Sequence, residues 1–263
     1  MPKFAANLGF LFPDIPFLDR FEAAARAGFR AVEYASPYTV SPDELVLRLK
    51  ECHLEQILHN FPAGNAPAGE RGLAAIPGRE AAFAESLEQA LSYARALQCP
   101  RLHVMAGIPP AAASLAECEA VYVRNLRLAA EHLKPYGIHL LIEPLNTRDN
   151  PGYFLTTPAQ AQRIMVQVGS DNLFLQMDLY HWQIMVGDLA ENMHTYFNIT
   201  GHVQIAGNPG RHEPDVGEIN YPYLFHLLDT LGYSGWIGCE YRPQGDTVAG
   251  LSWAQAYGLS KAM

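Results

Sequence analysis

Four oxygen-bearing side chains stand at or near the carboxyl ends of four successive apolar runs. They are Glu143 in "LLIE", Asp178 in "LQMD", Gln204 in "HVQIAG" and Glu240 in "IGCE". Ionised carboxylates are almost never buried without a partner, so three of them at the ends of strand-like segments need a partner. If they converge, a hard divalent cation relieves their repulsion, and oxygen ligands favour Mg²⁺ or Mn²⁺ over zinc. The alternative is that each acid pairs separately with a nearby Arg or Lys.

The segments that carry these residues belong to a repeated strand–helix pattern. Short apolar runs predict strands over 3–10, 30–35, 55–60, 101–107, 138–146, 173–181, 201–207 and 235–241. Helical periodicity predicts helices over about 15–29, 41–54, 79–97, 114–134, 157–167, 187–197, 221–232 and 248–258. Eight such pairs in 263 residues, with no break in composition, indicate an α/β fold, a single (β/α)₈ barrel domain over 1–263. An open doubly wound sheet is the main rival, but no GxGxxG follows the first strand.

Composition and charge limit the classes of partner. The formal net charge is −9 with a pI near 5.5, and no Lys/Arg cluster gives the basic footprint of a nucleic-acid binder. No apolar run approaches the roughly 18 residues of a membrane helix, and the first residues do not resemble a signal peptide. The four cysteines are widely spaced, without a CxxC pair, which is typical of reduced thiols. We therefore expect a cytoplasmic protein that binds neither nucleic acid nor membranes.

Several longer stretches give a more specific signal. The sequence resembles the hydroxypyruvate isomerase family of xylose isomerase-like barrels in "PAGERGLAAIPGRE", "LLIEPLN", "QMDLYHWQIM", "GHVQIAGNPGRHEPDVGEINYPYLF" and "GWIGCEYRPQGDT". The resemblance implies a (β/α)₈ barrel that converts hydroxypyruvate to tartronate semialdehyde through a cis-enediolate. It also implies that Glu143 and Glu240 are the acid/base pair and that Glu143, Asp178, Gln204 and Glu240 hold a divalent metal. Related sugar epimerases usually carry histidine where this chain has Gln204.

Histidines near the predicted strand ends are candidates for substrate contacts. His181 follows Asp178 by three residues, and the resemblance suggests that it contacts the substrate, although it would serve equally well in the cap of the next helix. His59 ends the third predicted strand and is a further candidate for substrate binding, as is His103 in the fourth. A lone strand histidine is, however, more often a satisfied core group.

An oxo-acid substrate carries a carboxylate, which arginine binds well through two parallel hydrogen bonds. Arg71 lies in a long Gly/Pro-rich loop at 61–78, and Arg211 lies after the seventh predicted strand. We expect one or both to hold the substrate carboxylate. The alternative is that they are solvated or pair with Glu70 and Glu213. The loop at 61–78 is also long enough to close as a lid.

Other functions remain open from the sequence alone. Close relatives isomerise 2-oxo-tetronate, a four-carbon acid, and the motifs suit either substrate. A DNA-repair endonuclease shares this barrel but usually binds three zincs through many histidines and carries a basic groove. A non-catalytic sugar-binding barrel would not need three converging carboxylates. Aromatic residues on the predicted helix over 221–232 leave a homo-oligomer open.

Overall fold

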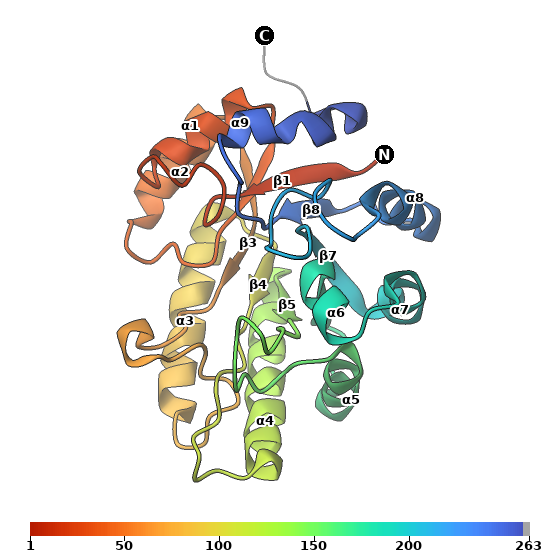
Figure 1. Cartoon of the computed structure of the whole chain (residues 1–263). Helices are drawn as coiled ribbons and strands as arrows, with labels where there is room; N and C mark the ends of the chain where they lie inside the picture. The colour runs from red at the N-terminus through yellow and green to blue at the C-terminus, as the bar shows by residue number, and fades with distance from the viewer. Residues whose placement is uncertain (260–263) are drawn as a thin grey trace.

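Eight parallel strands close into a barrel in the computed structural model, which describes residues 1–259 (Figure 1). Neighbouring strands pair in chain order, and β8 pairs with β1 to complete the ring. The strands are β1 (Lys3–Asn7), β2 (Ala31–Glu33), β3 (Glu55–Asn60), β4 (Arg101–His103), β5 (His139–Ile142), β6 (Leu173–Asp178), β7 (Thr200–Ile205) and β8 (Trp236–Cys239). The predicted (β/α)₈ barrel is therefore confirmed. The single-domain prediction extends to residue 263, and its last four residues lie outside the described part.

Helices surround the strands in Figure 1 and bury their apolar faces against them. They are α1 (Asp19–Arg26), α2 (Pro42–Glu51), α3 (Glu80–Leu97), α4 (Leu115–Leu133), α5 (Pro158–Val168), α6 (Leu179–Met185), α7 (Leu189–Tyr196), α8 (Tyr221–Leu231) and α9 (Thr247–Gly250). A serine followed by proline at the start of a helical period predicts a capped helix, and Ser41 does cap α2: its hydroxyl accepts the Glu44 N–H at 3.3 Å and Pro42 opens the helix.

Several predicted elements are shorter in the structure, and two of them also differ in kind. The strand expected over 173–181 ends at Asp178, because its carboxylate accepts the Tyr180 N–H at 2.8 Å and caps an extra short helix, α6. The helix expected over 248–258 is a single turn, α9, followed by a 3₁₀ helix over Leu251–Tyr257. The first difference matters for the site, because α6 turns His181 back over the strand ends.

The barrel interior changes from apolar to polar along its axis. Strand side chains alternate between the interior and the helices, so residues two apart face the same way. Ala5, Ala31 and Leu141 belong to a small apolar cluster, and the residues two places further along their strands are polar: Asn7, Glu33 and Glu143. All three are buried. The polar residues therefore gather towards the carboxyl ends of the strands, the usual position of an active site in this fold.

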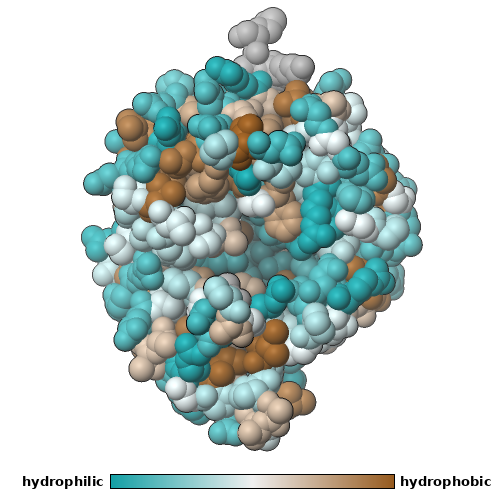
Figure 2. All heavy atoms as spheres, turned by 60° about the vertical axis from the view of Figure 1, so that its left-hand side comes forward, coloured by the Kyte–Doolittle hydropathy of each residue, from teal (hydrophilic) through white to brown (hydrophobic). Residues whose placement is uncertain are grey.

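The outer surface is mixed. Hydrophilic side chains predominate on the face shown in Figure 2, with the hydrophobic ones in small groups between them. Among the described residues, no helix combines the length and apolar character needed to cross a membrane. All four cysteines are free thiols, and three of them are buried.

Candidate active site

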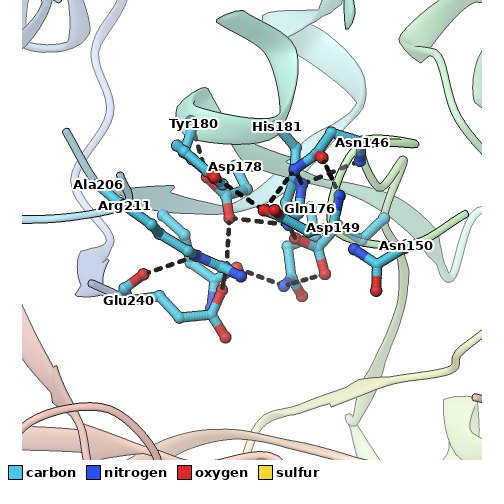
Figure 3. A network of polar contacts seen from close by, with 12 residues as sticks. Asn146, Asp149, Asn150, Gln176, Asp178, Tyr180, His181, Ala206, Arg211 and Glu240 are labelled. Atoms are coloured by element: carbon cyan, nitrogen blue, oxygen red, sulfur yellow. Dashed lines mark hydrogen bonds and ion pairs between the residues drawn. The ribbon is translucent and has the colours of Figure 1, made fainter. Parts of the chain in front are cut away.

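The four predicted oxygen ligands come from four consecutive strands at one end of the barrel. Glu143 follows β5 directly, Asp178 is the last residue of β6 and Glu240 follows β8. Gln204 in β7 lies in register with Asp178 on one side and with Gly238 of β8 on the other. Parallel pairing in this register brings the side chains to a common mouth, and Figure 3 shows two of them, Asp178 and Glu240, with their neighbours.

Glu143 and Asp178 form the part of the mouth most suited to a cation. With His181 they present three donor atoms that all lie within 4.8 Å of one another, and all three residues are buried. Glu143 Oε2 accepts a hydrogen bond from Gln176 Nε2 at 3.0 Å. Its other oxygen, Oε1, is buried without a hydrogen-bond partner among the described residues. A buried carboxylate oxygen with no donor fits a divalent cation, since unpaired buried acceptors are costly.

The electrostatics of Glu143 agree with this arrangement. Burial is the largest cause that raises the pKa of Glu143 well above its ordinary value, and the nearby carboxylates of Glu240 and Asp178 raise it further. Arg211 acts in the opposite direction. Without an added positive charge this glutamate therefore favours its protonated form.

His181 directs its Nε2 towards the same cluster. The backbone N–H of Asn146 donates to His181 Nδ1 at 3.0 Å. Burial lowers the pKa of His181 to about 4, so the ring is neutral and its proton is on Nε2. Nε2 lies 3.5 Å from Asp178 Oδ2 and 3.9 Å from Glu143 Oε1. Because a metal-bound Nε2 would require the proton on Nδ1, these hydrogen bonds favour a donor role for His181 over direct ligation.

Arg211 occupies the other side of the mouth. Its Nη2 donates to Glu240 Oε2 at 2.5 Å and to Asp178 Oδ2 at 3.2 Å, as Figure 3 shows. The guanidinium lies between the rings of Phe10 and Tyr180, 4.7 and 5.1 Å from their centroids. Burial opposes its charge, but Glu240, Asp178 and Glu143 together raise the pKa of Arg211. Arg211 therefore brings a fixed positive charge to the carboxylates, and its ion-pair partners are Asp178 and Glu240 instead of Glu213, the alternative partner considered for it.

Glu240 is held differently from Glu143. Asn7 Nδ2 donates to Glu240 Oε1 at 3.2 Å, while Arg211 binds the other oxygen. Burial is the main cause that raises the pKa of Glu240 to about 8, and Arg211 limits the rise. This strand-end glutamate therefore faces an amide, an arginine and the open mouth.

Gln204 is held by the layer beneath the mouth. Its amide nitrogen donates to Glu33 Oε1 at 2.7 Å, and its amide oxygen accepts from Gln176 Nε2 at 2.5 Å. Its amide oxygen is therefore on the same side as Gln176, which also donates to Glu143. An amide oxygen has two lone pairs, so one remains for a cation.

Of the two remaining predicted substrate residues, Arg71 lies near the mouth and His59 lies away from it. Arg71 is exposed, and its Nη1 donates to Asn150 Oδ1 at 3.2 Å, in the segment after β5. His59 does not reach the mouth: its Nε2 lies 3.4 Å from the Ala90 carbonyl of α3, and its Nδ1 lies 3.1 Å from Gln56 Nε2. The physical reason is the strand alternation, which turns His59 outward towards α3. His59 is therefore a core histidine with both ring nitrogens near hydrogen-bond partners, which is the more common role of a lone histidine in a strand.

The loop that carries Arg71 is also more fixed than a free lid. Gly72 bridges to Ala106, and the Ala75 N–H donates to the Ala106 carbonyl at 2.8 Å. A side chain at Gly72 would meet the Met105 carbonyl at 2.3 Å, so this close approach requires glycine. The second half of the loop is therefore bound to the end of β4 and places Arg71 beside the segment after β5.

Several site residues were missed in the sequence. The Tyr180 hydroxyl and the Asn146 amide donate to Asp149 Oδ2 at 2.7 and 3.1 Å (Figure 3). Burial opposes ionisation of Asp149, but these two donors hold its pKa below the ordinary value. The only signal in the sequence was position, because all three residues follow the ends of β5 and β6. His103 is also close, with Nε2 3.7 Å from Glu143 Oε2.

Comparison with known proteins agrees with the fold and with the sequence motifs. A family model described as a xylose isomerase-like TIM barrel matches residues 21–257. A 2-oxo-tetronate isomerase of Cupriavidus necator is 53% identical over 98% of this chain and 99% of its own length. The hydroxypyruvate isomerase of Escherichia coli is 48% identical over 98% and 100%. A crystal structure described as AP endonuclease, family 2, from Brucella melitensis is 49% identical, with a TM-score of 0.96 over 98% and 99% of the two chains. The chain therefore belongs to the xylose isomerase-like TIM barrel family.

Proposed function

We propose that this protein is an isomerase that moves a carbonyl between adjacent carbons of a small oxo-acid. The observation that carries the proposal is the convergence of Glu143, Asp178 and Glu240 at the mouth of the barrel, with Arg211 beside them. Two glutamates from β5 and β8, strands that are not neighbours, provide two separate sites for proton transfer. The names of the relatives support the same reaction type.

Hydroxypyruvate is our first candidate substrate, with tartronate semialdehyde as the product. The four-carbon 2-oxo-tetronate is the second, because relatives of similar identity carry either name. Arg211 and Arg71 are the proposed carboxylate partners. Arg211 supports this role with its buried guanidinium at the mouth, and Arg71 with its place beside Asn150.

The proposed reaction needs one proton removed at C3 and one returned at C2. One glutamate accepts the C3 proton, which leaves a cis-enediolate, and the other glutamate donates a proton to C2. The hydroxyl proton passes from the C3 oxygen to the C2 oxygen, so that the carbonyl forms at C3 and the hydroxyl at C2. His181 donates its Nε2–H to a substrate oxygen and so orients the two reacting carbons. Burial raises the pKa of both glutamates, and Arg211 donates directly to Glu240 alone of the two. The two residues therefore differ in their charged partner, which gives them different environments for proton transfer.

Glu143, Asp178, Gln204 and Glu240 are the proposed ligands for Mg²⁺ or Mn²⁺. The unpartnered Glu143 Oε1 and the oxygen-only donor set support this assignment. A divalent cation bound there would polarise the substrate carbonyl as a Lewis acid and balance the carboxylates. For Glu240 to join the set, Arg211 has to release Oε2, which would leave its guanidinium available for the substrate carboxylate.

The other candidate functions have less support. The endonuclease description belongs to the Brucella protein, and a net charge of −9 works against binding a phosphate backbone. Within residues 1–259, the groups able to hold a metal form a single cluster, Glu143, Asp178 and His181, whereas the endonuclease class usually has three zincs. We also propose a cytoplasmic location, which the four free cysteines support.

Isotope exchange tests the proposed chemistry. The purified protein with Mg²⁺ or Mn²⁺ is given hydroxypyruvate and, separately, 2-oxo-tetronate in D₂O. Proton transfer through an exchangeable glutamate predicts deuterium at C2 of the product, detected by NMR. Turnover without deuterium at C2 would indicate a hydride shift and overturn the two-glutamate mechanism. No turnover of either acid with the metal bound would overturn the proposed substrates.

A further inference from the structure

A carboxylate that the proposed reaction does not use lies directly beneath the mouth. Glu33 ends β2 and is completely buried inside the barrel. Its Oε1 accepts from Asn7 Nδ2 at 3.0 Å and from Gln204 Nε2 at 2.7 Å, and its Oε2 accepts from His202 Nε2 at 2.7 Å. Burying a carboxylate costs free energy unless donors compensate it, and here three donors surround the Glu33 carboxylate.

Strand β8, which like β2 pairs with β1, leaves room for this carboxylate. Gly238 of β8 faces Glu33, and a Cβ atom at Gly238 would lie 2.4 Å from Glu33 Oε1. Any other residue at position 238 would displace the acid or the strand. Glycine at 238 and glutamate at 33 are therefore complementary, although 205 residues separate them in the sequence.

The contacts of Glu33 decide which way the amide of Gln204 points. An ionised carboxylate only accepts hydrogen bonds, so the amide group facing Glu33 has to be the NH₂. The Gln204 oxygen must then point away from Glu33, and Gln176 Nε2 binds it there at 2.5 Å. With the amide reversed, an oxygen would face the Glu33 carboxylate and an NH₂ would face the NH₂ of Gln176. Both contacts would be repulsive.

The same carboxylate also reaches Glu240 through one residue. Asn7 Nδ2 donates both to Glu33 Oε1 and to Glu240 Oε1, the second at 3.2 Å. The Asn7 oxygen accepts the Gly9 N–H at 3.0 Å, which fixes the orientation of that amide as well. Glu33 is therefore in contact, directly or through Asn7, with two of the four proposed metal ligands.

We propose that Glu33 is a positioning residue that presents the oxygen of Gln204, and not its nitrogen, to the cation at the mouth. This inference rests on the proposed ligand set, and Gln204 is its direct target. Partners that orient metal ligands typically change metal affinity by 10- to 100-fold when they are removed. The same size of effect is expected here.

Mn²⁺ binding to the substrate-free protein tests the proposal without relying on activity. Titration calorimetry measures the Mn²⁺ Kd of the wild type, Glu33→Gln and Glu33→Asp. Glu33→Gln replaces one accepting oxygen by an NH₂, so we expect its Kd to rise about 10- to 100-fold. Glu33→Asp keeps the charge but withdraws the carboxylate by one methylene, and a smaller rise is expected.

A double-mutant cycle separates positioning from general support of the fold. In a Gln204→Ala background the oxygen is absent, so Glu33→Gln should weaken Mn²⁺ binding by no more than about twofold, the part that reaches Glu240 through Asn7. Equal weakening in both backgrounds would show that Glu33 acts only as structural support and would overturn the proposal. If Glu33→Gln fails to fold, as judged by circular dichroism, the same cycle with Glu33→Asp decides.

Asp178→Asn distinguishes failure of this inference from failure of the proposed ligand set. If Asp178→Asn weakens Mn²⁺ binding while the Glu33 variants keep the wild-type Kd, the cation site stands and the role of Glu33 is refuted. If Asp178→Asn also binds Mn²⁺ like the wild type, the ligand set itself is wrong, and the inference about Glu33 is overturned with it.

Discussion

The two sides of the barrel mouth hold their glutamates in different ways. On the β5–β6 side, Glu143 lies beside Asp178 and the neutral His181, and one of its oxygens has no partner among the described residues. On the β8 side, both oxygens of Glu240 accept hydrogen bonds, one from Asn7 and one from Arg211. One glutamate lacks a positive partner in contact, and the other already has one.

The two environments suit the glutamates to different partners, Glu143 to an added cation and Glu240 to the arginine already beside it. A buried acceptor without a donor is suited to an added cation, whereas an acid paired with arginine is already balanced. Arg211 also contacts Asp178, so it lies on the boundary between the two sides. The proposed cation at Glu143 and Asp178 would therefore compete with the guanidinium of Arg211 for the Asp178 carboxylate.

The largest expected effect is on turnover, where both sides should prove essential. We expect Glu143→Gln and Glu240→Gln each to lower kcat by at least ~10²-fold, the usual scale for a general acid or base. Activity is measured at saturating Mn²⁺, with metal occupancy determined for each variant, because the lost charge also weakens metal binding. Glu22→Gln, on the exposed face of α1, is the matched control. Two Gln variants that remain active with metal bound would refute the acid/base pair.

The second prediction concerns the pH dependence of stability that comes from His59, a buried histidine in the barrel wall outside the mouth. Burial lowers the pKa of both His181 and His59 to about 4, but His59 lies outside the mouth. In the unfolded chain His59 binds a proton near pH 6.5, whereas in the folded protein it stays neutral down to about pH 4. His59 therefore lowers the stability of the folded protein as the pH falls from 6.5 towards 4. The shift corresponds to about 3 kcal/mol.

A His59→Gln variant isolates that contribution. Glu143 and Glu240 have raised pKa values and act in the opposite direction, with stability lost as the pH rises above their unfolded values. These groups are common to both proteins and cancel in the difference. Urea unfolding between pH 7 and 4 should therefore show the wild type losing stability relative to His59→Gln. A constant difference over this range would contradict a neutral buried His59.

The third prediction concerns competition between Arg211 and the cation. Removing the positive charge beside Asp178 and Glu240 should strengthen the attraction of the mouth for Mn²⁺. We expect Arg211→Gln to lower the Mn²⁺ Kd several-fold, and Asp178→Asn to raise it by about tenfold or more. Arg163→Gln, which removes an arginine paired with Glu119 on the surface, is the control. If Arg211→Gln binds Mn²⁺ more weakly, the two cations do not compete.

The smallest expected effect concerns the carboxylate clamp. Arg71 is exposed and hydrogen-bonded to Asn150, so Arg71→Ala should raise KM for the oxo-acid several-fold with kcat little changed. Arg211→Ala should raise KM by about tenfold, because a buried charged hydrogen bond contributes more. Steady-state kinetics with folding checked by circular dichroism measures both. Wild-type KM values in both variants would place the clamp elsewhere.

The sequence by itself determined the barrel and the level of its active site. Eight apolar runs, each followed by a helical period, are compatible with few folds, and parallel strands in a barrel bring their carboxyl ends to one mouth. This rule alone places Glu143, Asp178 and Glu240 at that mouth, because strand order and strand ends are local properties of the chain. The cap at Ser41 was predictable for the same reason.

Only the tertiary structure decided which side chains meet. His59 and His181 were both candidates, and the pleat of β3 turns one outward while α6, an element missed in the sequence, turns the other over the mouth. The pairing of Arg211 with Asp178 and Glu240, and of Glu33 with Gln204 and Gly238, joins residues far apart along the chain. Such contacts depend on register and barrel closure, which have no local signature, so the residue types in the sequence could not reveal them.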